Sequence, residues 1–489
     1  MKNKTIFIYI NDGFAHRYLL RSDVFKTLRD RTDLRIIILA HNANEDGFRD
    51  FYESENIFVE EISDDDYASY LASSKLQRIL IQIRAHVLNG KEDTTTIDDF
   101  KEIFIIQNRW SKDDGLLRHI LGIFFRITTE ILKRSSALRN LLIQFEQICL
   151  TPKIHTDLFE KYNPDLLLVT GLTGFLYNEF IAREAIKNNV RVCNIVLSWD
   201  NTSGNGMPGY VPDSVISWTD NMKKELINMN DIPEEKIHVG GVAHWDSYYK
   251  DQILIKKEEL FDKLGLNHDR KVIFYATKSP RRFPWGPNLI ESIAIEIEKG
   301  TFSDDVQLLV RIHPLHFRRK DGSYVFQEIL DEYARIESKY DSIVLNMPKL
   351  QSKQMDFDMA DSEISLVASI LQHSDIMINM FSTMAIEAAI FDLPVVNMAI
   401  RDMCQGDIKN TKQDIMIDYR QTHNQRVIQS GGCRTAFTME ELIDYINLYL
   451  SDPNEDSKGR EYICTHEAGP FPGHAGENIG NIIIQLLND

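Results

Sequence analysis

Three short stretches in the second half of the chain collect side chains that bind anions. They are Lys278, Ser279, Arg281 and Arg282; Arg311 and His313; and Ser382 and Thr383. Lysine and arginine donate charge-assisted hydrogen bonds to phosphate oxygens, and a helix N-terminus adds backbone N–H donors beside its serine and threonine hydroxyls. Together such groups could hold a diphosphate and stabilise its charge as it leaves, without a metal ion.

Each of these stretches follows a short apolar run with the length of a buried strand. The runs are Lys271–Ala276, Val306–Arg311 and residues 376–380. In a parallel α/β sheet the carboxyl ends of the strands share one edge, and ligands bind there. We therefore expect the three stretches to face one rim. Taken singly, the first could be an exposed basic turn, and the second a strand end stopped by Pro314.

The third stretch begins a strand–turn–helix–strand unit over residues 374–398. The predicted helix, 385–391, carries one carboxylate, Glu387, about one turn beyond Ser382 and Thr383. That carboxylate could reach a sugar hydroxyl on the same ligand. The alternative is a capped helix with one buried acid tied to a backbone donor.

The remaining apolar runs alternate with helical patterns and predict an α/β fold. Runs at 5–10 and 34–40 open the series, runs at 165–170, 190–197, 215–218 and 236–240 continue it, and a new series begins at Lys271. A chain of 489 residues is too long for one ordinary core. We predict two domains, residues 1–250 and 251–474, with a final helix over 475–489 that packs back on the first.

Residues 67–150 lack strand signals, and we interpret them as a helical insertion in the first domain. Apolar residues at helical spacing fill 116–148, among basic residues such as Arg118, Arg126 and Lys133. We interpret this segment as a core-facing helix with a solvated basic side. A membrane-surface or partner helix, with peripheral membrane contact through 116–148, is the alternative.

Bulk composition excludes several classes of protein. The formal net charge of -18 argues against a general nucleic-acid binder. The five cysteines are scattered without a CxxC pair, which fits a reducing cytoplasm and offers no zinc site. We find no signal peptide and no spanning segment. The acidic runs 64–66 and 356–358 are interpreted as solvated loop charge, so no metal site is predicted.

At this point the sequence resembles a known family. The two-half layout, the Arg-Ile-His-Pro turn at 311–314 and the unit over 374–398 look like the GT-B glycosyltransferases, with two Rossmann-like domains facing a central cleft. The nearest likeness is to bacterial surface-polysaccharide enzymes with an HP motif and a Ser/Thr motif: the polysialyltransferases, the capsule Kdo transferases and the CDP-glycerol polyol-phosphate transferases. The segment 213–246 also looks like the last unit of their N-terminal domain.

The resemblance implies a nucleotide-activated donor in the C-terminal domain and a glycan or lipid-linked glycan acceptor in the N-terminal one. By motif position, His313, Ser382 and Thr383 would contact the donor phosphates, and Glu387 would hold the nucleotide ribose. The third motif, Phe-Ser-Thr-Met, lacks the Gly-Gly that many GT-B enzymes have there. The resemblance implies no cofactor besides the nucleotide-sugar, which is a substrate.

Inverting transfer needs a general base near the acceptor hydroxyl. Asp12 and His16, after the first predicted strand, are the leading candidates, and Asp200, after Trp199, is the next. Each could equally form a turn or cap a helix.

The preferred hypothesis is a metal-independent glycosyltransferase of surface polysaccharide biosynthesis, located in the cytoplasm, with the inner face of the membrane as an open alternative. Transfer of a polyol phosphate from a CDP-alcohol is a second hypothesis. A UDP-sugar 2-epimerase uses the same two-domain fold, but its Gly-Gly-Glu-Glu run is missing here. A catalytically silent nucleotide-sugar binder is the alternative from another class.

Overall fold

The computed structural model describes residues 4–488 except 251–252, 321, 351–358, 405, 407 and 410. The described residues divide into two compact units. Unit 1 contains the chain up to Asp246 and again from Gly469, and unit 2 contains the residues between. Among the described helices, none combines the length and the apolar character that crossing a bilayer requires.

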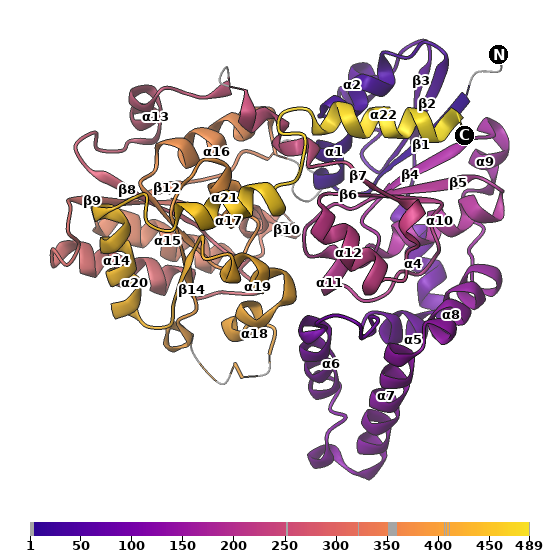
Figure 1. The fold of residues 1–489 in the computed structure, drawn as a ribbon, viewed down its shortest axis with the longest axis horizontal. Helices are drawn as coiled ribbons and strands as arrows, with labels where there is room; N and C mark the ends of the chain where they lie inside the picture. Colours follow the sequence, from indigo (N-terminus) through magenta and orange to yellow (C-terminus); the bar gives the residue numbers. More distant parts are fainter. Residues whose placement is uncertain are drawn as a thin grey trace. The chain divides into compact units, whose positions relative to one another are not determined.

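Unit 1 is built on a parallel sheet (Figure 1). Its strands are β1 (Lys4–Ile10), β2 (Leu34–Ala40), β3 (Ile57–Glu61), β4 (Leu166–Thr170), β5 (Arg191–Ile195), β6 (Ser214–Ser217) and β7 (Ile237–Val239). They lie in the order β3-β2-β1-β4-β5-β6-β7, and β1 pairs in parallel with both β2 and β4. Chain order runs outward on either side of the β1–β4 pair, which makes this pair the switch point of a doubly wound sheet.

The helices of unit 1 connect these strands. They are α1 (Gly13–Leu19), α2 (Asp23–Arg29), α3 (Phe48–Tyr52), α4 (Asp64–Ser73), α5 (Lys75–Arg84), α6 (Thr95–Gln107), α7 (Leu116–Arg134), α8 (Ser136–Cys149), α9 (Thr156–Tyr162), α10 (Leu176–Lys187), α11 (Asn201–Gly204), α12 (Asp220–Asn228) and α22 (Ala475–Asn488). Helices α4 to α8 lie between β3 and β4 in sequence, which confirms the predicted helical insertion.

A buried ionic network joins the insertion to the sheet-covering helix α10. Arg84 of α5 bonds Glu146 of α8 at 2.6 Å and Glu179 of α10 at 2.7 Å. Arg183 of α10 bonds the same Glu146 at 2.7 Å, and both of these side chains are fully buried. Because each charge has a partner at short range, the network can persist out of water and fixes α5 and α8 on the domain.

The sequence interpretation of residues 116–148 was wrong about which side of the helix is solvated. Arg126 pairs with Glu102, Lys133 pairs with Asp98, and Arg139 is buried against Asp231. The side chains left in solvent on α7 and α8 are instead mostly apolar. Helical spacing identified the helices, but it does not tell which of two apolar faces a helix buries.

The C-terminal helix packs on unit 1. Gly476 and Gly480 are one turn apart on α22, and a Cβ atom built at Gly480 would meet Thr27 of α2 at 2.6 Å. The carboxylate of Asp246 accepts hydrogen bonds from the N–H groups of Ala475 and Gly476 at 2.9 and 2.6 Å, and so caps the start of α22.

Unit 2 repeats the architecture. Its strands are β8 (Lys271–Ala276), β9 (Val306–Arg311), β12 (Ile343–Asn346), β13 (Ile376–Asn379), β14 (Val395–Met398) and β15 (Arg434–Ala436), with a small antiparallel pair, β10 (Arg319–Lys320) and β11 (Ser323–Tyr324). The main sheet has the order β12-β9-β8-β13-β14-β15, with every described pairing parallel. Its switch point is the β8–β13 pair.

The helices of unit 2 are α13 (Lys257–Leu264), α14 (Gly286–Glu298), α15 (Gln327–Lys339), α16 (Asp361–His373), α17 (Met384–Ile390), α18 (Ile415–Arg420), α19 (Thr422–Gln429), α20 (Met439–Ser451) and α21 (Ser457–His466). Sequence reasoning missed the short pair β10 and β11, and it also missed β3 and β15. Both are edge strands, and β15 has only three residues, so neither gives a clear apolar run.

Candidate functional site

The carboxyl ends of β8, β9 and β13 form the rim on which the three predicted anion-binding stretches lie. Lys278 follows β8, His313 follows β9, and Ser382 follows β13, and these three strands are neighbours in the sheet. The hydroxyl of Thr277 accepts a hydrogen bond from the His313 N–H at 2.8 Å, which ties the first loop to the second. The rim includes the switch point between β8 and β13, where open α/β sheets bind ligands.

Lys278 bridges that switch point. Its Nζ donates to the Met380 carbonyl after β13 at 3.1 Å and to the buried carboxylate of Asp418 at 2.5 Å. Burial lowers the pKa of Lys278, and Asp418 opposes that shift. An ammonium has three N–H donors, so the third has no acceptor among the described residues. Asp418 neutralises the charge of Lys278, and the third N–H is left as a hydrogen-bond donor for an anionic ligand.

His313 is a neutral imidazole with a defined tautomer. Burial, reinforced by His316 and Lys278, lowers the pKa of His313 to about 3. Its Nδ1 accepts the N–H of Leu315 at 3.2 Å, so in the neutral ring Nε2 carries the proton. At physiological pH the neutral ring of His313, at the end of β9, therefore carries its proton on Nε2.

A second histidine of this turn, His316, was not singled out from the sequence. It is fully buried and lies edge-on to the ring of Tyr333, and its Nδ1–H donates to the His313 carbonyl at 3.0 Å. Burial lowers its pKa to about 4. His316 holds the backbone of His313 in place; its three-residue spacing from His313 was the one signal in the sequence.

Ser382 and Thr383 begin the turn into α17. Phe381, directly before them, has a left-handed backbone with φ of 54°, which is unfavourable for a residue with a Cβ. The Ser382 hydroxyl donates to Asn379 Oδ1 at 2.6 Å, and Thr383 occupies the N-cap position of α17 without a side-chain capping bond. Within this turn the Ala385 N–H donates to the Ser382 carbonyl at 3.1 Å, and the Ile386 N–H donates to the Thr383 carbonyl at 2.9 Å.

The guanidinium of Arg311 is bonded to other side chains of unit 2. Its guanidinium bonds Glu363 Oε2 at 2.6 Å and also Asn346, with only 8% of the Arg311 side chain exposed. A buried pair of this kind already neutralises the cation. The sequence could not reveal this, because Glu363 lies on α16, far along the chain.

The basic loop after β8 is hydrogen-bonded to the segment before α18. Arg282 donates to the Lys412 carbonyl at 3.0 Å, and the Arg281 carbonyl accepts from Gln413 at 3.3 Å. The Arg281 side chain is exposed, and Ser279 is half-buried. With the Lys278–Asp418 pair, these bonds give the loop a fixed frame.

Glu387 lies half-buried on α17. Its Oε2 accepts a hydrogen bond from the Tyr248 hydroxyl at 2.6 Å. Tyr248 packs against the ring of Phe391 at the end of the same helix. The tyrosine fixes the orientation of the carboxylate, a contact absent from the sequence expectation.

The three candidate bases in unit 1 differ in their surroundings. The Asp12 carboxylate caps α1 by accepting the Ala15 N–H at 2.7 Å. His16 is 2% exposed, and its Nε2 lies 2.7 Å from the Tyr52 hydroxyl, so it is part of the core. Asp200 stands before α11 after β5, and its carboxylate bonds no other residue in the described part of the chain.

The sequence did not predict a polar cluster of Asp64, His41 and Tyr9 in unit 1. Asp64 lies in the first turn of α4, so the interpretation of residues 64–66 as loop charge was wrong. Its carboxylate is 3.0 Å from His41 Nε2, and the ring of His41 lies edge-on to buried Tyr9. Burial, with Asp64 adding to it, raises the pKa of Tyr9. The run 356–358 lies outside the described residues.

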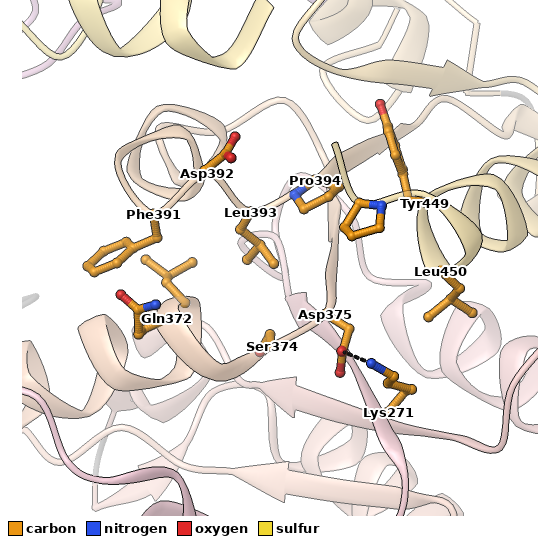
Figure 2. Close-up of a pocket in the computed structure, with 12 residues that line it drawn as sticks. Lys271, Gln372, Ser374, Asp375, Phe391, Asp392, Leu393, Pro394, Tyr449 and Leu450 are labelled. Atoms are coloured by element: carbon orange, nitrogen blue, oxygen red, sulfur yellow. Dashed lines mark hydrogen bonds and ion pairs between the residues drawn. The ribbon is translucent and has the colours of Figure 1, made fainter. Parts of the chain in front are cut away.

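A cavity of about 190 Å³ in unit 2 opens at the opposite end of the sheet (Figure 2). It is lined by residues at the amino ends of strands, including Lys271, Asp375 and Pro394. The ammonium of Lys271 is 2.9 Å from Asp375, so its charge is neutralised. Ligands of doubly wound sheets bind at carboxyl ends, so this cavity is not the expected nucleotide site.

Comparison with known proteins gives structural matches only. No family model and no curated protein sequence matches the chain. The S. aureus MnaA–UDP structure matches with a TM-score of 0.54 at 14% identity, covering 99% of this chain and 97% of that one. UDP-GlcNAc 2-epimerase from Neisseria meningitidis bound to UDP-GlcNAc matches with a TM-score of 0.52 at 14% identity, covering 99% and 100%.

A third solved structure is of another kind of enzyme. Sucrose-phosphate synthase from Thermosynechococcus elongatus matches with a TM-score of 0.50 at 11% identity, covering 99% of each chain. At these identities the likeness concerns the fold. The chain has the GT-B fold, with two Rossmann-like domains, as its sequence resemblance predicted.

Proposed function

We propose that the chain is a nucleotide-sugar-dependent glycosyltransferase whose unit 2 binds the donor diphosphate at the carboxyl ends of β8, β9 and β13. The observation that supports this most is the buried ammonium of Lys278 at the switch point, with its third N–H lacking an acceptor among the described residues. Neutral His313 stands on the neighbouring strand end.

These groups have the chemistry that departure of a nucleotide requires. As the bond between sugar and diphosphate breaks, negative charge grows on the leaving oxygen. Lys278 supplies a charge-assisted donor, and the Nε2–H of His313 supplies a neutral one. Donors fixed in advance stabilise that charge without reorganising, and this needs no divalent cation.

The remaining roles extend this proposal. Glu387, oriented by Tyr248, would accept hydrogen bonds from the ribose hydroxyls of the nucleotide. Transfer to an acceptor hydroxyl also needs a base. Of the three candidates in unit 1, Asp200 is the one that we retain, because Asp12 caps α1 and His16 is bonded in the core. The acceptor class, a glycan or lipid-linked glycan of surface polysaccharide, rests on the sequence resemblance.

A UDP-sugar 2-epimerase is the second candidate. The likeness in fold to UDP-GlcNAc 2-epimerases over the full chain favours it. Epimerisation removes and returns a proton at carbon 2 of the sugar, which calls for acid–base groups facing the sugar. Of the acidic side chains near the unit 2 rim, Asp418 is paired with Lys278, Glu363 is paired with Arg311, and Glu387 accepts a hydrogen bond from Tyr248. That composition suits leaving-group stabilisation and is why transfer is preferred.

A panel of UDP, GDP, CDP and CMP sugars, with and without oligosaccharide acceptors, separates the two candidates. A transferase releases nucleotide when the acceptor is present. An epimerase keeps the nucleotide attached and incorporates solvent deuterium at carbon 2. A CDP-alcohol in the same panel covers polyol-phosphate transfer. Unchanged product formation by both Lys278→Ala and His313→Ala, or the absence of binding by every donor, would overturn the proposal.

A further inference from the structure

Helix α7 exposes an apolar stripe to solvent. Leu117, Ile120, Phe124, Ile127 and Ile131 recur every three or four residues and therefore lie on one face of the helix. Leu117 is 79% exposed and Phe124 is 67% exposed. Large apolar side chains scattered singly on a surface are ordinary, but a row of them along a helix marks an interaction site.

Helix α8 continues the pattern. Leu141 and Ile148 are 62% and 73% exposed and lie two turns apart on one side of that helix. We call the exposed apolar faces of α7 and α8 together the α7–α8 stripe. Both helices satisfy their packing with other side chains: Phe125, Thr129 and Leu132 of α7 are buried. The stripe therefore plays no part in the core of unit 1.

Basic side chains lie near the two ends of α7. Residues 109–134 contain six basic and three acidic side chains, within a chain of net charge -18. Lys112, in the turn before α7, and Arg118, in the first turn of α7, are exposed and make no ion pair with another described residue. Arg134, at the end of α7, is 78% exposed and forms an exposed pair with Glu130 at 2.8 Å. This is a local positive excess at the two ends of an apolar face.

We propose that the α7–α8 stripe docks on an anionic lipid bilayer, with α7 lying in the plane of the headgroups. An amphipathic helix binds such a surface by burying its apolar face at the acyl boundary while its Lys and Arg side chains meet lipid phosphates. The 19 residues of α7 form a rod of about 28 Å that could lie flat there.

A lipid surface fits the stripe better than a second copy of the chain. Two copies that each carry a charge of -18 repel one another, and protein interface cores are depleted of charge, whereas anionic lipid attracts the cations at both ends of α7. Figure 1 shows α6 and α7 extending away from the sheet of unit 1, and the side chains of the stripe are exposed to solvent. This proposal is independent of the nucleotide chemistry of unit 2.

Vesicle flotation of the full chain tests the proposal, with phosphatidylcholine vesicles that contain or lack phosphatidylglycerol. Wild-type protein should float with the anionic vesicles, and added salt should weaken binding. Phe124→Gln and Leu117→Gln should each weaken partitioning by about tenfold, because each withdraws a large apolar side chain from the bilayer. Arg118→Glu should weaken binding to anionic vesicles only.

The matched control is Phe51→Gln, which alters a phenylalanine of α3 that is 76% exposed and lies outside the stripe. It should bind vesicles like the wild type. Circular dichroism and light scattering of each variant establish that the fold and the oligomeric state are unchanged. Failure of the wild type to bind anionic vesicles overturns the proposal. A wild-type dimer that Phe124→Gln separates, without vesicle binding, would assign the stripe to a second copy instead.

Discussion

The buried ionic network of unit 1 predicts a large and local effect of Glu146→Gln. The Glu146 carboxylate accepts hydrogen bonds from Arg84 Nε at 2.6 Å, Arg183 Nη2 at 2.7 Å and Gln77 Nε2 at 2.6 Å. The substitution keeps the size of the side chain and removes its charge. Arg84 would then keep its bond to the Glu179 carboxylate, whereas buried Arg183 would lose the carboxylate to which it is bonded.

The magnitude follows from the loss of a buried counter-charge. Burial lowers the pKa of Arg183 even with Glu146 present, which reflects how costly its desolvated charge is. Removing one partner of a buried ion pair costs about 3–5 kcal/mol. A domain has a total free energy of unfolding of about 5–15 kcal/mol, so unit 1 should lose a substantial part of its stability.

Native-state hydrogen exchange and urea unfolding measure this effect. Amides of α5 and α8 should exchange at least about a hundredfold faster in Glu146→Gln, because these helices are held on α10 through the network. The control is Glu130→Gln, which breaks the exposed pair with Arg134 and should change stability by less than about 0.5 kcal/mol. Equal stability of the two variants would refute the assigned role of the network.

Two further predictions concern unit 2 and the C-terminal helix. Burial lowers the pKa of His316 to about 4, whereas an unfolded histidine titrates near 6.5, so the unfolded chain binds more protons between these pH values. The free energy of unfolding of unit 2 should therefore fall as pH drops from about 6.5 towards 4, and His316 should account for about 3 kcal/mol of that fall. Calorimetry of His316→Phe should show a shallower dependence of stability on pH than the wild type. The same pH dependence in the variant and the wild type would contradict the burial of a neutral His316. Asp246→Ala removes the carboxylate that caps α22 and should destabilise that helix by about 2 kcal/mol, measured as faster exchange of its amides; unaltered exchange would argue against the cap.

Much of the fold was accessible from the sequence because buried parallel strands are near-continuous apolar runs. The runs at β1, β2, β8 and β9 have this character, and their alternation with helical patterns predicted two α/β domains. Short edge strands such as β15 carry too little signal. Strand order, which places the switch point between β8 and β13, depends on packing between distant segments and cannot be read from local pattern.

The same limit applies to the candidate site. Position at strand ends predicted that Lys278, His313 and Ser382 would lie on one rim, and the structure has them on neighbouring strands. The sequence did not reveal that Arg311 is neutralised by Glu363, because such a partner is found only in three dimensions. It also could not distinguish the buried face of α7 from its exposed one, since both are apolar.

Calorimetric titration of UDP, GDP, CDP and CMP into the wild type and His313→Ala tests the central claim most directly. If His313 Nε2–H donates to a donor phosphate, its loss should weaken binding of the preferred nucleotide about 10- to 100-fold, since a hydrogen bond to a charged group contributes about 1.5–3 kcal/mol. The control, His268→Ala, alters an exposed histidine that precedes β8 at the opposite end of the sheet and should bind like the wild type. Equal affinity of His313→Ala and wild type, or the absence of binding by every nucleotide, would contradict a diphosphate site on this rim.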